Sequence, residues 1–279
     1  MAGRSMRKMV FPLIIALSLS LIHAYSGFAE TILSEGFESG VLGEGWEKNT
    51  DDTLRLAFER RPEYVHSGKA SYRVSIQNLD GKAMGSNIKF FFLPGVDKAH
   101  FRWYGKFSDE MKTGLSHYVF ITGSRMDNKY SPLGQAGNAA DGTNFFVTNL
   151  EPSTHRGKYP PPGIMGFYTY WPDMKPDPRS GKYWGNRFEP DEPFQLETGR
   201  WYCFEAMIKL NEPGKRDGEQ AFWVDGKNLL HMTDMRWRES DILRLNMLNL
   251  ELYYGHPEHD MSVWFDDVVI DTDYIGPMD

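Results

Sequence analysis

Cysteine is almost absent from this sequence, and that scarcity limits how the fold can be held together. Cys203 is the only cysteine among 279 residues, so no internal disulfide can form and a hydrophobic core must supply the stability. No cysteine lies near residue 29, where the apolar N-terminal region ends, so no lipid anchor is expected. Beyond that region no run is apolar enough to span a bilayer.

Positive charge is also in short supply. The chain has 31 Lys and Arg against 38 Asp and Glu, a net charge of −7, which argues against nucleic acid or an anionic membrane as a partner. An acidic polysaccharide is still compatible, because a local basic groove can lie on an acidic protein. Aromatic residues make up 14% of the chain, which suits sugar-stacking surfaces and a β-rich core equally well.

The N-terminus has the pattern of a secretory signal peptide. Arg4, Arg7 and Lys8 precede the apolar run 10–22, and Ala29 is a small residue suited to cleavage. We therefore expect residues 1–29 to be removed and residues 30–279 to form one domain. The mature chain is predicted to be a monomer that is secreted or periplasmic.

No long stretch has a convincing helical period. Short runs of alternating apolar and polar residues recur between Gly, Pro, Asn and Asp, which predicts an all-β fold of two antiparallel sheets, a sandwich or jelly roll. The strands are expected at 31–38, 54–60, 70–77, 87–93, 99–107, 117–122, 144–148, 164–170, 201–210, 220–225, 245–253 and 262–271. Two long Gly- and Pro-rich loops, 123–143 and 171–198, are predicted to wall a site.

Four predicted strands have an apolar face and a face that is polar or aromatic. Side chains alternate across a strand, so each face can be read from the sequence. We expect a concave sheet to gather the polar faces into a groove for an anionic polysaccharide. The residues of these faces, together with Asn144, are Arg102, Tyr104, Lys106, Tyr168, Tyr170, Glu205, Lys209, Asn249, Glu251 and Tyr253.

Several of these segments, taken in order, resemble one enzyme family. AHFRWYGKFSDEM (99–111), His117 in GLSHYVF, the Tyr-x-Tyr strand, WYCFEAMIKLNEPGKRDGEQAFWVDGK (201–227) and the terminal WFDDVVI are similar to the concanavalin A-like polysaccharide lyases. The pattern resembles the alginate lyases and the glucuronan lyase-like proteins over roughly 31–275. The resemblance implies a β-sandwich that cleaves or binds a uronic-acid polymer.

The resemblance also implies roles for individual residues. Tyr168 and Tyr170 match the family's Tyr-x-Tyr pair, and His117 lies near the position of a family lysine. The family's Ser-x-Arg pair is not evident in TNFFVTN (143–149), which leaves Arg102, Arg125 or Asn144 to neutralise the substrate carboxylate. Catalysis would then fall to His117, Tyr168, Tyr170 and Arg102, with no catalytic cofactor.

Two other functions stay open. A glycoside hydrolase needs two carboxylates beside the bond, and Glu205 with Glu251 would serve if their strands were neighbours. The ExDxxE motif of sandwich-fold glucanases is absent, however. A non-catalytic carbohydrate-binding domain is the other alternative, because one sandwich fold hosts many functions.

The stretch ELYYGHPEHDMSVWFDD (251–267) is dense in metal-ligand residue types. His256 and His259 lie in a Gly- and Pro-containing loop, which disfavours a rigid zinc site. Asp266 interrupts an apolar run, and a buried carboxylate needs a partner. We expect a structural calcium ion bound by Asp266 with Glu35 or Glu38, since oxygen ligands suit that ion.

Overall fold

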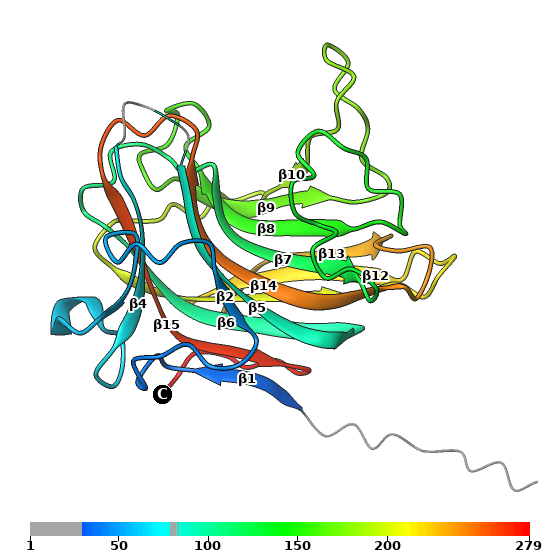
Figure 1. Cartoon of the computed structure of the whole chain (residues 1–279). Coiled ribbons are helices and arrows are strands. Elements are labelled where there is room, and N and C mark those ends of the chain that lie inside the picture. Colours follow the sequence, from blue (N-terminus) through cyan, green and yellow to red (C-terminus); the bar gives the residue numbers. More distant parts are fainter. Residues whose placement is uncertain (1–29, 79–81, 83) are drawn as a thin grey trace, which may run out of the picture.

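The computed structural model describes residues 30–78, 82 and 84–279. The predicted signal peptide, residues 1–29, lies outside the described residues. Two antiparallel sheets pack face to face, and the only helical element in the described part of the chain is the short 3-10 turn Pro62–Tyr64 (Figure 1). The all-β sandwich prediction is therefore confirmed. No helix within the described ranges has the length and apolar character of a membrane span.

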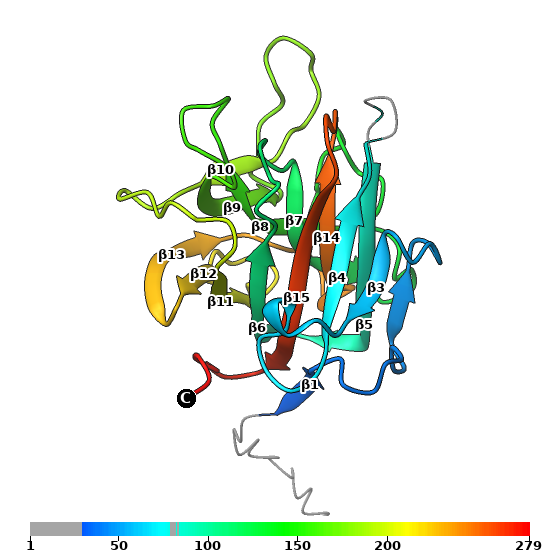
Figure 2. The same cartoon turned by 90° about the vertical axis from the view of Figure 1, so that its left-hand side faces the viewer.

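The eight-stranded sheet contains the first and the last strand of the described chain. Its order is β13-β12-β11-β6-β15-β4-β3, and β1 pairs with β15 beside this path (Figure 2). Its strands are β1 (Thr31–Glu35), β3 (Leu56–Glu59), β4 (Ser71–Ile76), β6 (Lys98–Phe107), β11 (Trp201–Lys209), β12 (Gly218–Val224), β13 (Lys227–Met235) and β15 (Met261–Asp271).

The seven-stranded sheet has the order β10-β9-β8-β7-β14-β5-β2. Its strands are β2 (Trp46–Lys48), β5 (Met84–Val96), β7 (His117–Arg125), β8 (Phe146–Ser153), β9 (Ile164–Tyr170), β10 (Asn186–Phe188) and β14 (Leu243–Tyr254). Twelve of the strands correspond to predicted ones. The other three, β2, β10 and β13, escaped prediction because they are very short or mostly exposed.

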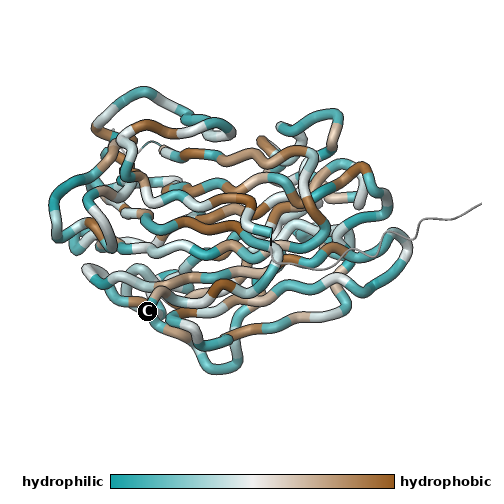
Figure 3. The backbone as a smooth tube through the Cα atoms, turned by 90° about the horizontal axis from the view of Figure 1, so that it is seen from below, coloured by the Kyte–Doolittle hydropathy of each residue, from teal (hydrophilic) through white to brown (hydrophobic). Residues whose placement is uncertain are grey.

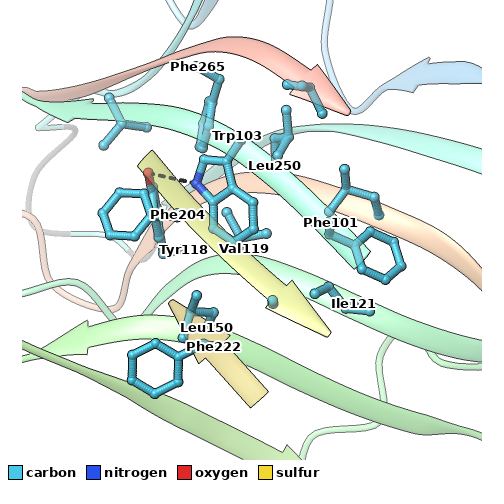
Figure 4. Packing of buried hydrophobic residues seen from close by; sticks show 14 of the residues in the cluster. Phe101, Trp103, Tyr118, Val119, Ile121, Leu150, Phe204, Phe222, Leu250 and Phe265 are labelled. Carbon is cyan, nitrogen blue, oxygen red and sulfur yellow. Dashed lines mark hydrogen bonds between the residues drawn. The ribbon is translucent and has the colours of Figure 1, made fainter. Parts of the chain in front are cut away.

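The core lies between the sheets and follows from strand alternation. Trp103 on β6 and Phe204 on β11 meet Tyr118 on β7, and all three are fully buried (Figure 4). Trp103 Nε1 donates a hydrogen bond to Tyr118 Oη over 3.3 Å, which joins the two sheets. A Cβ at position 105 would lie 2.1 Å from that hydroxyl, so Gly105 makes the contact possible.

Hydrophobic residues follow the strands through the centre of the molecule, and hydrophilic residues gather in the loops at its rim (Figure 3). The segment between β7 and β8 and the segment between β9 and β10 both rise from the seven-stranded sheet (Figure 1). They correspond to the two loops predicted to wall a site. Such a site would therefore lie on the outer face of this sheet.

Candidate functional site

A cavity of about 470 Å³ opens on the outer face of the seven-stranded sheet. This volume falls in the range of ligand sites, which is roughly 300–1,000 Å³. Strands β5, β14, β7, β8 and β9 form its floor, and residues 132–136 of the first long loop form a wall. Polar or titratable side chains in its lining include Asn87, Lys89, His117, Thr122, Gln135, Asn149, Tyr170, Asn249, Glu251 and Tyr253.

Register explains how residues distant in sequence come together here. Asn249 on β14 lies opposite Lys89 on β5 and Phe120 on β7. Phe120 lies opposite Asn149 on β8, and Asn149 lies opposite Tyr168 on β9. Directly opposed residues share a face of the sheet, so these side chains form one row across five strands. The row continues to Arg187 on β10, which lies opposite Tyr168.

His117 reaches the cavity through an irregularity in this register. The β7–β14 pairing shifts between Leu250 and Tyr253, where Tyr253 lies opposite His117. Simple alternation from Phe120 would turn Tyr118 outward, yet Tyr118 is fully buried in the core and His117 lines the cavity. Such irregularities re-aim side chains and are frequent beside active sites.

The His117 ring is oriented by its neighbours. Nδ1 lies 3.1 Å from Glu151 Oε2, and the ring stacks on Tyr253 with centroids 5.5 Å apart. A carboxylate at Nδ1 holds the proton there when the ring is neutral. No described residue hydrogen-bonds Nε2, so its lone pair is available to a ligand.

The charge state of His117 depends on three effects. Burial lowers the pKa of His117, but the hydrogen bond to Glu151 and the negative charges of Glu151 and Glu251 outweigh burial, and the net shift is upward from 6.5. The imidazole therefore holds its proton to a higher pH than a free histidine would. As a base it would act above that raised pKa.

Glu151 is fixed from the opposite side by a line of ion pairs. Its Oε1 lies 3.1 Å from Arg187 Nη1, while Arg187 Nε lies 2.9 Å from Glu189 Oε1. His155 Nε2 lies 2.7 Å from the same Glu189 oxygen. Glu151 is only 4% exposed, and a buried carboxylate needs such partners. Arg187 thereby positions the group that orients His117.

On the other side of His117, the pKa values of Glu251 and Lys89 are both shifted from their usual values. Burial raises the pKa of Glu251, although the charges of His117 and Lys89 and a hydrogen bond from Asn249 oppose that rise. Burial lowers the pKa of Lys89, and Glu251 and Glu47 partly restore it. Lys89 Nζ donates to Asn87 Oδ1. The cavity thus holds a cation beside a carboxyl group that is readily neutralised.

Tyr168 and Tyr170 complete the site at β9. Their hydroxyl oxygens are 3.4 Å apart, and their rings lie at 87° to each other. Burial, followed by the hydrogen bond to Tyr170, raises the pKa of Tyr168. Tyr170 lines the cavity, and the Tyr168 ring centroid is 6.1 Å from that of His117. The Tyr168 hydroxyl therefore stays protonated near neutral pH, which suits a proton donor.

Five predicted site residues lie elsewhere, and the prediction that they share a face with His117 is wrong. They are Arg102, Tyr104 and Lys106 on β6 and Glu205 and Lys209 on β11, all in the eight-stranded sheet. Strand alternation shows which side chains share a face of one strand, but it does not show which sheet the strand joins. The order of family-like segments along the chain does not show this either.

These five side chains have partners of their own. Tyr104 Oη accepts from the Met278 amide over 2.7 Å, and Glu205 pairs with His100 Nδ1 over 2.7 Å. The Ile275 and Gly276 amides also donate to Glu205, and Arg102 Nη1 donates to the Gly276 carbonyl over 3.4 Å. Lys106 Nζ bonds the Glu63 carbonyl and Lys209 Nζ bonds Glu219. Tyr104, Glu205 and Arg102 therefore bind the C-terminal segment. Lys106 and Lys209 bond to other residues outside the cavity.

The hydrolase pair is excluded for the same reason. Glu205 is on β11 of one sheet and Glu251 on β14 of the other, so they cannot flank one glycosidic bond. The proposed carboxylate neutralisers are occupied as well. Asn144 bonds within the 139–145 turn, and Arg125 Nε donates to Asp127 over 2.8 Å. Neither residue lines the cavity.

The carboxylates proposed to bind calcium have hydrogen-bond donors. Asp266 accepts from the backbone amides of His66, Ser67 and Asp267, and Glu35 accepts from the Phe37 amide over 2.6 Å. Among the residues that the structure describes, no group of three or more His, Cys, Asp or Glu side chains could hold a metal ion. The calcium site stays a prediction, which melting with and without a chelator would test.

Several site residues were missed by sequence reasoning. Asn149, Glu151 and Phe120 belong to predicted strands or their continuations, and alternation along VTNLE (147–151) would have turned Asn149 and Glu151 outward together. The predicted strand ended at 148, so both Asn149 and Glu151 lay outside it. Lys89 and Arg187 carry no local signal, because only register brings them beside the cavity.

Comparison with known proteins points to polysaccharide lyases. Residues 167–268 match the family model for polysaccharide lyase 14. No curated protein sequence matches the chain. The matched segment includes the second half of β9, with Tyr168 and Tyr170, and all of β14, with Glu251.

Solved structures show the same fold along most of the chain. The marine PL-14 alginate lyase from Aplysia kurodai is 13% identical with a TM-score of 0.63, covering 88% of this chain and 100% of its own. An alginate lyase from Chlorella virus is 15% identical with a TM-score of 0.62, again covering 88% and 100%. The endo-beta-1,4-glucuronan lyase from the fungus Trichoderma reesei is 12% identical, with a TM-score of 0.54 and 82% and 92% covered. The resemblance to these jelly-roll lyases is thereby confirmed.

Proposed function

We propose that this chain is a secreted lyase that cleaves an anionic, uronic-acid-containing polysaccharide by β-elimination in the cavity of the seven-stranded sheet. The observation that carries the proposal is the His117 ring, held at Nδ1 by Glu151 with Nε2 available, beside the Tyr168 and Tyr170 hydroxyls. The family match and the fold of the alginate and glucuronan lyases support the same reaction class.

The reaction needs a base and an acid close together. His117 Nε2 takes the C5 proton of the uronate, the released electron pair forms the C4–C5 double bond, and the C4–O4 bond breaks. Tyr170 donates a proton to the departing oxygen, with the Tyr168 hydroxyl 3.4 Å behind it. General acid–base groups of this kind contribute roughly 10²–10⁴-fold each.

The C5 proton is acidic enough only if the neighbouring carboxylate is neutralised. Lys89 is the cationic side chain in the cavity lining that would neutralise this carboxylate. The two carboxyl groups of the site do not cancel it, since Glu151 is paired with Arg187 and burial raises the pKa of Glu251. Charge stabilisation of this kind is usually the largest contribution to catalysis.

Incubation with a panel of alginate, glucuronan and related polymers tests the proposal. A lyase produces the ultraviolet absorbance of an unsaturated uronate, and His117→Ala abolishes it. Reducing ends without that absorbance would indicate hydrolysis. Polymer binding with neither product would indicate a carbohydrate-binding domain, and either result would overturn the lyase.

A further inference from the structure

Two asparagine side chains in the cavity have carbonyl oxygens without a partner. Asn149 is fully buried and Asn249 is 3% exposed, and no described residue bonds the Oδ1 atom of either. Both residues line the cavity. A buried acceptor that lacks a hydrogen bond costs free energy, and such groups are rare in folded proteins.

Hydrogen bonds determine which end of each amide is free. Asn149 Nδ2 donates to the Tyr168 carbonyl over 3.4 Å, and Asn249 Nδ2 donates to Glu251 Oε2 over 2.6 Å. The partners of both NH₂ groups are acceptors, so the oxygens are the ends left over. The cavity therefore presents two buried acceptors, which call for donors on a ligand.

Phe120 lies between the two amides. It is opposite Asn149 on one side and opposite Asn249 on the other, so the asparagines are two strand spacings apart, roughly 10 Å. The Phe120 ring is partly exposed and its centroid is 5.0 Å from that of His117. An apolar platform thus lies beside the base, with an acceptor at each edge.

This arrangement matches one part of a sugar and rejects another. The C–H face of a pyranose packs on an aromatic ring, and its hydroxyl groups point outward as donors. A carboxylate offers only acceptors, so it would meet a carbonyl oxygen unfavourably. The Thr122 hydroxyl is also buried without a partner, but a hydroxyl both donates and accepts and does not discriminate.

We propose that Phe120, Asn149 and Asn249 form a subsite that binds the hydroxyl-bearing part of the sugar chain and requires those hydroxyls to be free. The inference rests on the proposed function and narrows its substrate. The preferred polymer carries unmodified hydroxyls at this subsite, and O-acetylated uronate is a poor ligand. The uronate carboxylate is left to Lys89, which lies beyond Asn249 on the neighbouring strand β5.

Binding without turnover tests the subsite separately from the chemistry. The full-length His117→Ala protein serves as reference, and calorimetry measures its affinity for a free-hydroxyl oligouronate and for the same oligomer after O-acetylation. Adding Asn149→Ala or Asn249→Ala should weaken binding of the free oligomer by roughly tenfold, the scale of one lost hydrogen bond. Binding of the acetylated oligomer should be weak and unchanged by either substitution.

Matched variants separate recognition from folding. Asn228→Ala on β13, in the other sheet, should leave both affinities unchanged. Melting temperatures identify variants that lose structure. Asn149→Asp retains an oxygen acceptor at the same position, so it separates loss of the acceptor from other effects of substitution there. Equal affinity of the Ala variants and the reference for the free oligomer would overturn the subsite, as would equal losses for both oligomers or a reference that binds neither. Absence of unsaturated product from the wild type, with these binding differences intact, would overturn only the lyase.

Discussion

At the scale of single residues, the proposed chemistry depends on which nitrogen of His117 carries its proton. Glu151 lies at Nδ1, so the neutral ring presents Nε2 to the substrate. Glu151 is itself held by Arg187, which makes Arg187 a positioning residue two contacts away from the reacting atom. This division of roles between base and orienting carboxylate is common to many general-base sites.

Replacing His117 tests its role as the base. His117→Ala should lower the rate of unsaturated-product formation at least about a hundredfold, because the proton acceptor is lost. The melting temperature should change little, since the side chain is 30% exposed and lines a cavity. Lys106→Ala, in the other sheet, is the control and should retain the wild-type rate. Comparable losses in both variants would contradict the assignment.

The pH profile tests the coupling between His117 and Glu151. The base must be deprotonated, so kcat/KM should rise with pH through the His117 pKa, which lies above 6.5. Glu151→Gln removes the negative charge that raises this pKa and should move the rising limb to lower pH. Glu189→Gln removes a carboxylate that does not touch His117 and should leave the limb nearly in place. A limb that stays fixed in Glu151→Gln would show that another group titrates.

At the scale of secondary-structure elements, strands with similar sequence patterns have different roles in the two sheets. Strands β6 and β11 have a charged outer face that resembles a binding surface in sequence. In the fold the segment 275–278 covers part of this face through hydrogen bonds to Glu205, Arg102 and Tyr104. The face is therefore a docking surface for the chain's own end.

Glu205 should matter for stability and not for turnover. It is 1% exposed and bonds His100 and two backbone amides, so Glu205→Ala leaves three donors without their acceptor. Breaking a buried pair of this kind costs roughly 3–5 kcal/mol of unfolding free energy. Urea denaturation measures the loss, and the turnover of the folded fraction should equal that of the wild type. Lost turnover in a folded Glu205→Ala protein would revive a catalytic role for this residue.

At the scale of the whole molecule, the position of the site depends on how the sheets are joined. Trp103 and Phe204 from one sheet and Tyr118 from the other meet in the core (Figure 4). Tyr118 is the neighbour of His117 in sequence, so the residue that anchors the core is adjacent to the residue that enters the cavity. Packing at this point and the register shift of β7 together determine where the base lies.

Removing the inter-sheet hydrogen bond should weaken the sandwich without altering its shape. Tyr118→Phe keeps the ring but leaves Trp103 Nε1 buried without an acceptor, a loss of about 1–3 kcal/mol in unfolding free energy. Urea denaturation should show this decrease while the circular-dichroism spectrum stays that of a β protein. Tyr130→Phe, an exposed tyrosine in the loop after β7, is the matched control and should change stability far less. An unchanged midpoint for Tyr118→Phe would contradict this account of the seam between the sheets.

The sequence by itself determined the fold class, most of the strands and which side chains of a strand point the same way, because alternation and turn residues are local properties. It also identified Tyr168 and Tyr170 as a pair and, through family resemblance, His117. Only the tertiary structure decided which sheet each strand joins. That choice placed Arg102, Tyr104 and Glu205 far from His117, and it brought Lys89, Asn149 and Glu151 to the cavity. The physical reason is that sheet order and register come from non-local pairing and core packing, which no single segment of sequence encodes.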